Sequence, residues 1–245
     1  YLRHANGAGD ADDEFGYGSS RMVPVAGRFG PLPGHDQPPP HLVSIPPLQL
    51  GDSGGAVLAL QEALAEGAFY RGALDGDYGP GTAYAVRAFH QAAALPKGSN
   101  WQDGDWESLL GYRHGGFPNR PNEPDRIEVD LGRQVLFLID DHQVEAVIPV
   151  SSGNGAVYYS APSGRYVKAR TPRGDFRFRR HIAGWRYNYL GALYRPWYFT
   201  TAYAIHGSNS VPNHPASHGC VRVPNWEADF LEGQLWIGMP VHVWD

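Results

Sequence analysis

The chain has 245 residues, of which 42% are hydrophobic and 18% charged, so it can bury the core of one large domain or two smaller ones. Its formal net charge is −5 and no block of lysine and arginine stands out, which argues against nucleic acid or an anionic membrane as a partner. No apolar run approaches the ~20 residues that span a bilayer. The chain begins at Tyr1 and not at Met, so we expect an upstream segment, a signal or an anchor, to have been removed.

Residues 1–44 are rich in glycine and proline and contain Pro38-Pro39-Pro40 and an acidic stretch at 10–14. This composition interrupts every helical or strand period, so it predicts an extended tail or linker.

Residues 45–112 carry a helical period. Apolar residues recur at spacings of three and four, and turn-dense loops separate the runs, which predicts three short helices. The pattern rests on Val57, Leu60, Leu64, Val86, Phe89, Trp106, Leu109 and Leu110.

This segment resembles the peptidoglycan-binding domain of the three-helix type. The resemblance implies binding to the glycan of the bacterial cell wall, and we expect contacts from loop residues such as Asp77 and Tyr78. The matching residues are Leu50-Gly51-Asp52-Ser53-Gly54, Val57, Leu60-Gln61, Leu64, Asp75-Gly76, Tyr78-Gly79-Pro80, Thr82, Ala85-Val86 and Phe89.

Glycine and proline mark residues 113–124 as a linker, after which the period changes to that of strands. Residues 125–245 are predicted to form a mostly antiparallel β domain that opens with a strand over 126–130, followed by a hairpin over 134–150. A short helix is predicted from Asn225. Further strands are predicted near 175–180, 197–206, 219–223 and 240–244.

The only cysteine, Cys220, lies in Ser217-His218-Gly219-Cys220-Val221-Arg222, and a single cysteine excludes a disulfide scaffold within the chain. A thiol becomes a useful nucleophile when it is deprotonated or lies beside a base. His206 is predicted to end one strand and Cys220 to begin another, so the loop between them can bring imidazole and thiol together.

The neighbours of Cys220 suit acyl transfer. The amides of Gly219 and Cys220 are candidate oxyanion donors, which typically contribute about 10²–10³ in rate. Ser217 and Ser208 supply hydroxyls, and Arg222 alternates onto the strand face of Cys220, where it can hold a carboxylate or carbonyl.

Two alternatives compete with a nucleophile: a buried filler thiol, and a zinc ligand grouped with His206, His214 and His218. One cysteine and three histidines at these spacings match no common zinc pattern, so we expect no metal and no cofactor.

Residues 125–245 resemble the L,D-transpeptidase catalytic domain, also called the YkuD domain, which implies a β-sandwich-like fold and cysteine acyl transfer on cell-wall peptides. The matching stretches are Pro149-Val150-Ser151-Ser152-Gly153, Thr171-Pro172-Arg173-Gly174-Asp175-Phe176, Ala204-Ile205-His206-Gly207-Ser208, Ser217-His218-Gly219-Cys220-Val221-Arg222 and Pro240-Val241-His242-Val243.

By this resemblance Cys220 is the nucleophile and His206 the general base. The site-shaping residues would be Gly207, Ser208, Ser217, His218 and Gly219. The implied reaction is L,D cross-linking of peptidoglycan stem peptides outside the cytoplasm, with a tetrapeptide donor and release of its terminal D-amino acid. Carbapenem-type β-lactams are expected to acylate the cysteine. L,D-carboxypeptidase activity and a catalytically idle wall-binding protein are the alternatives.

An aromatic run precedes the His206 motif, and some of its rings are expected to line the substrate cleft. We assign substrate binding to Trp197 and Tyr198, together with Arg222.

Overall fold

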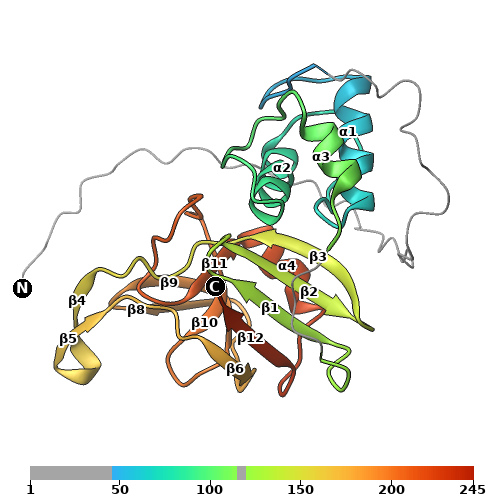
Figure 1. Ribbon diagram of the computed structural model, residues 1–245. Helices are drawn as coiled ribbons and strands as arrows, with labels where there is room; N and C mark the ends of the chain where they lie inside the picture. The colour runs from blue at the N-terminus through green and yellow to red at the C-terminus, as the bar shows by residue number, and fades with distance from the viewer. Residues whose placement is uncertain (1–45, 115–119) are drawn as a thin grey trace, which may run out of the picture.

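The computed structural model describes residues 46–114 and 120–245 (Figure 1). The tail predicted at 1–44 and the middle of the linker predicted at 113–124 lie outside the described residues. The described part begins with α1 (Gly55–Glu66), α2 (Pro80–Ala92) and α3 (Asp105–Gly111), as the apolar period predicts. No helix in the described ranges has the length and apolar character needed to cross a membrane.

A buried glutamine organises the helical domain. The Gln61 amide nitrogen donates to the Asp75 carboxylate at 2.8 Å and to the Asp77 carbonyl at 2.9 Å, and its oxygen accepts from the Gly76 amide at 2.9 Å. The Asp75-Gly76 loop is therefore folded around a side chain of α1. The expected glycan contact from Tyr78 is wrong, because its ring is buried and its hydroxyl donates to the Ser99 carbonyl.

Most of the remaining strands form two five-stranded sheets that share a core. The first has the order β3-β2-β1-β12-β6, and its β1 and β12 strands are parallel. The prediction of a mostly antiparallel domain holds for the other pairs of this sheet. Its strands are β1 (Arg126–Asp130), β2 (Val135–Asp140), β3 (Gln143–Pro149), β6 (Gly174–Arg177) and β12 (Pro240–Trp244).

The second sheet has the order β11-β10-β9-β7, with β8 paired to β9. The strand predicted at 197–206 is in fact two strands, because the chain turns after Phe199, where Phe199 and Thr200 donate to the Tyr203 carbonyl. A helix, α4 (Asn225–Glu232), follows β11 as predicted. The strands are β7 (Arg180–His181), β8 (Trp185–Asn188), β9 (Gly191–Tyr198), β10 (Ala204–Ser208) and β11 (Val221–Pro224).

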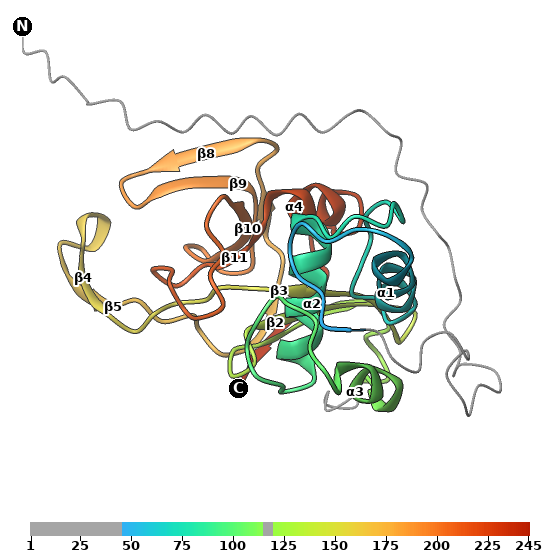
Figure 2. The same cartoon turned by 90° about the horizontal axis from the view of Figure 1, so that it is seen from above.

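Two hairpins project from the same end of the β domain (Figure 2). One joins β4 (Val157–Ser160) to β5 (Arg165–Lys168) through the short 3-10 helix η1 (Ala161–Ser163), and the other is β8–β9. The sequence patterns did not predict β4, β5 or β8, because these strands are largely exposed and lack a buried apolar face.

The helical domain and the first sheet share a hydrophobic core. Along β2, Val135 and Phe137 pack into the core of the helical domain, whereas Leu136 and Leu138 pack into the core between the sheets. This strand is buried on both faces, which explains its continuous apolar sequence. α2 lies over β2 and β3 (Figure 1). Arg71 makes a two-oxygen ion pair with Glu227 of α4 at 2.7 Å.

We expect Phe137→Ala to destabilise both domains together. The ring is fully buried between them, and truncation of a buried phenylalanine typically costs about 3–5 kcal/mol. Hydrogen exchange measured by mass spectrometry should show α2 and β2 losing protection in parallel. Loss of protection in α2 alone, with β1 and β12 unchanged, would show that the domains unfold independently.

Candidate active site

Parallel pairing of β10 with β11 brings the two predicted catalytic residues together. Ile205 pairs with Val221 and His206 with Arg222, so Cys220, one residue before β11, lies beside the start of β10. The thiol hydrogen-bonds the backbone of Ala204. Because neighbouring strands are about 4.8 Å apart, imidazole and thiol belong to one local site.

His206 is held in one orientation and one tautomer. Its ring is 5% exposed, and Nδ1 lies 2.8 Å from the Gly207 carbonyl oxygen. A carbonyl can only accept, so Nδ1 carries the proton and Nε2 is left as the basic nitrogen. The pKa of His206 is lowered to about 4, chiefly by burial and also by the charge of Arg222, against the opposing effect of the Gly207 bond.

The pKa of Cys220 is shifted in the direction that keeps the thiol protonated. Burial raises the pKa of the thiol, while the Ala204 hydrogen bond and the Arg222 charge partly oppose the rise. At neutral pH the pair is therefore a neutral thiol beside a neutral imidazole. The imidazole is ready to accept a proton, and no thiolate–imidazolium ion pair is stored in the resting site.

Ser217 folds the turn that presents Cys220. Its hydroxyl donates to the Cys220 carbonyl at 2.5 Å and accepts from the Gly219 amide at 2.9 Å. Gly219 has φ +130°, and a Cβ there would lie 2.4 Å from the Tyr203 ring, so both conformation and space require glycine. The Gly219 amide is already bonded, which leaves the Cys220 amide as the candidate oxyanion donor from this turn.

The segment after β3 supports the same turn from the other side. Ser151 and Arg222 exchange two backbone hydrogen bonds at 3.0 Å, and the Ser217 amide donates to the Ser152 carbonyl at 2.8 Å. Gly153 is needed here, because a Cβ would lie 2.4 Å from the Ala169 carbonyl oxygen. The predicted stretch 149–153 thus contributes backbone and carries no reacting side chain.

Two tyrosines that the sequence patterns did not single out, Tyr158 and Tyr203, lie near the thiol, and Tyr189 of the predicted aromatic run lies near both of them. The Tyr158 ring of β4 packs edge-on against His218, with centroids 4.7 Å apart. Burial raises the pKa of Tyr158 and of Tyr203, and the nearby Cys220 and Tyr189 raise both further. No local motif marks Tyr158 and Tyr203, because one lies on β4 and the other in the turn between β9 and β10, so they meet only in the folded chain.

The other predicted site residues fall into two groups. Gly207 is packed tightly, since a Cβ would lie 2.8 Å from the Asn225 side chain, and the Ser208 hydroxyl bonds the Ser210 backbone. Trp197 and Tyr198 are buried, and the Trp197 ring stacks on His181 within the core. Both rings are largely enclosed, which argues against the predicted substrate contact, and their binding role stays a prediction.

Arg222 is half-buried in β11, and burial lowers the pKa of its guanidinium. Its charge acts on both His206 and Cys220, as the two pKa shifts show. Within residues 46–114 and 120–245, no three His, Cys, Asp or Glu side chains are grouped as a metal site would need.

Alkylation of Cys220 by iodoacetamide should be at least about tenfold slower at pH 7 than alkylation of the denatured chain, since only the thiolate reacts. The rate should climb with pH beyond the ordinary thiol range, because burial raises the pKa of Cys220. His206→Gln should leave this profile in place, since the neutral ring adds no charge. A rate plateau between pH 5 and 8 would instead reveal an ion pair.

Comparison with known proteins gives the site a context. Residues 124–243 match the L,D-transpeptidase catalytic domain family, and residues 53–97 match a peptidoglycan binding domain family. A search of curated protein sequences finds no match.

Among solved structures, an L,D-transpeptidase from Xylanimonas cellulosilytica is 38% identical with a TM-score of 0.75, covering 85% of this chain and 100% of that one. An L,D-transpeptidase from Stackebrandtia nassauensis is 20% identical with a TM-score of 0.48, over 80% and 94% of the two chains. The first structure combines 38% identity with complete coverage of the relative. The family match covers the same β domain. The chain therefore belongs to the L,D-transpeptidase family, with a catalytic domain of that family following a peptidoglycan-binding domain.

Proposed function

We propose that Cys220 is the acyl-accepting nucleophile of an L,D-transpeptidase and that His206 is its general base and acid. The observation that carries the proposal is the hydrogen bond from His206 Nδ1 to the Gly207 carbonyl, which leaves Nε2 basic on the strand beside the thiol. A neutral imidazole with a pKa of about 4 remains unprotonated across the physiological range, so it is always available as a base.

In the first half-reaction the Cys220 sulfur attacks the carbonyl that precedes the terminal D-residue of a tetrapeptide stem, and His206 takes the thiol proton. The tetrahedral intermediate collapses when His206 gives this proton to the departing amine of the D-amino acid, leaving a thioester. In the second half-reaction an amine of a neighbouring stem attacks the thioester. His206 removes the amine proton and returns it to the sulfur, so the enzyme is regenerated and an L,D cross-link has formed.

The surrounding groups have distinct tasks in this proposal. The Cys220 amide stabilises the developing oxyanion, since the Gly219 amide already donates to Ser217. Tyr158 and Tyr203 place hydroxyl groups near the thiol, where they can orient the amides of the stem peptide. Arg222 stabilises the anionic sulfur during attack through its charge, as its effect on the pKa of Cys220 indicates.

The domain layout supports a wall contact by the helical unit. We propose that residues 45–112 bind peptidoglycan, that residues 113–124 connect the domains, and that residues 125–245 perform the chemistry outside the cytoplasm. The family match at 53–97 supports the first assignment and that at 124–243 supports the last.

Incubation of the full chain with a disaccharide-tetrapeptide should add to Cys220 the mass of the stem without its terminal D-residue, as seen by intact-mass spectrometry. Cys220→Ala should abolish adduct and product, and His206→Gln should slow acylation by about 10²–10⁴-fold through loss of general acid–base catalysis. Product formation by Cys220→Ala would refute the nucleophile. Cross-linked dimers identify a transpeptidase, whereas release of tripeptide alone identifies the L,D-carboxypeptidase alternative. An intact fold with no adduct identifies the idle binding protein.

A carbapenem should acylate Cys220, because its strained amide resembles the bond that the thiol attacks. The expected result is a stoichiometric mass increase on a peptide that contains Cys220, absent from Cys220→Ala. An unchanged mass after prolonged exposure would contradict the proposed acylation chemistry.

A further inference from the structure

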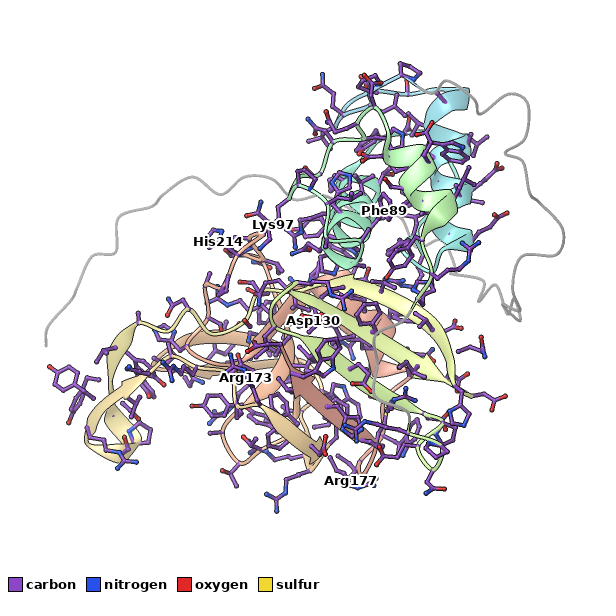
Figure 3. The ribbon with its side chains drawn as sticks, in the orientation of Figure 1. Phe89, Lys97, Asp130, Arg173, Arg177 and His214 are labelled. Carbon is purple, nitrogen blue, oxygen red and sulfur yellow. The ribbon has the colours of Figure 1, made fainter. Side chains whose placement is uncertain are left out.

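A cavity of about 360 Å³ lies between the helical domain and the loop that leads to Cys220. Pro80, Tyr84 and Arg87 of α2 line one wall, and Asn213 of the catalytic domain lines the other. Figure 3 shows Lys97 and His214, the sequence neighbours of lining residues Gly98 and Asn213, close together where the two domains meet. The volume falls in the range of small-molecule sites.

The cavity contains a buried arginine whose charge is not paired. Arg87 is only 8% exposed, and no Asp or Glu of the described ranges forms an ion pair with it. Its Nη1 donates to the Val211 carbonyl at 2.6 Å, and its guanidinium lies 4.5 Å from the centre of the Tyr84 ring. Burial lowers the pKa of this guanidinium, which shows the cost of holding the charge away from water.

The unpaired edge of Arg87 has the geometry of a carboxylate receptor. Nε and Nη2 are both buried and make no hydrogen bond of good geometry, although the Tyr84 side chain interacts favourably with the guanidinium charge. These two nitrogens form the parallel fork that binds a carboxylate through two bonds. Arg87 is the only lining residue with a formal charge, which matches a monoanion better than a phosphate dianion. The apolar side chains of Leu50, Pro80 and Ala83 suit the body of an organic ligand.

We propose that this cavity is a second ligand site, which binds the carboxylate of an N-acylated amino acid or short peptide on the Arg87 fork. Identification of that carboxylate with a peptidoglycan stem rests on the proposed function. Because the fork is covered, the ligand must displace part of the lining to reach it. Leu50 is 60% exposed and is the least constrained part of that lining.

The site is connected to the catalytic turn through the same guanidinium. Nη1 holds Val211 in the loop between His206 and Cys220, while Tyr84 packs edge-on against Trp226 of α4, with ring centroids 5.0 Å apart. α4 directly follows β11. A carboxylate on the fork therefore acts on segments both before and after the nucleophile.

The test is a titration of the full chain carrying Cys220→Ala. Binding is monitored through the NMR amide signals of Gly98 and Ser99. The probe is N-acetylglycine, and its uncharged counterpart is N-acetylglycinamide. The acid should give saturable shifts at these two residues, and the amide should bind at least about tenfold more weakly. Inorganic phosphate should also bind more weakly than the acid.

Arg87→Met should abolish the shifts, and Arg87→Lys, which keeps the charge without the fork, should weaken binding at least about tenfold. As a control, Arg113→Met removes an exposed arginine that follows α3, and it should leave the N-acetylglycine shifts unchanged. Equal binding of acid and amide, preference for phosphate, retained binding in Arg87→Lys, or no shifts at all would overturn the proposal. Since Cys220 is absent from the assay, failure here is separate from failure of the acyl-transfer proposal.

Discussion

The parallel pairing of β10 with β11 is the constraint on which the active site depends. Adjacent parallel strands cannot be joined by a tight turn, and their connection needs about a dozen residues or more. Here that connection is the loop from Asn209 to Cys220, which explains why the histidine and the cysteine are separated in sequence yet adjacent in the fold. The loop has no helix of its own, so its shape comes from bonds made to other segments, such as those of Ser152 and Arg87.

Burial has opposite effects on the two reacting groups, and together these effects favour a stored neutral pair. It lowers the pKa of His206 and raises that of Cys220, so both groups favour their uncharged forms at neutral pH. Such a thiol resists unwanted oxidation and alkylation, since those reactions need the thiolate. The resting thiol would therefore react slowly with other reagents, which favours reaction with a bound acyl donor.

The sequence was sufficient for the elements with a strong period or motif. The apolar stripes predicted α1 and α2, and the run through Phe137 predicted a strand whose burial on two faces is now explained by α2. The hairpins β4–β5 and β8–β9 escaped prediction because their exposed strands have no core to pattern them. Tyr158 of β4 was missed for the same reason, and Tyr203 was missed because it lies in the turn between β9 and β10. Trp197 was assigned to the substrate although the core encloses it.

The shared core around Phe137 and Val147 also holds the helical domain against the first sheet. Two domains on a flexible tether explore a volume that grows with tether length, and the effective concentration of the second site falls accordingly. Here α2 is packed directly on the sheet, so a glycan strand held by the first domain would meet the catalytic thiol at a set distance and angle. The enzyme would then cross-link only those stems whose distance from the bound glycan matches the fixed distance between its two domains.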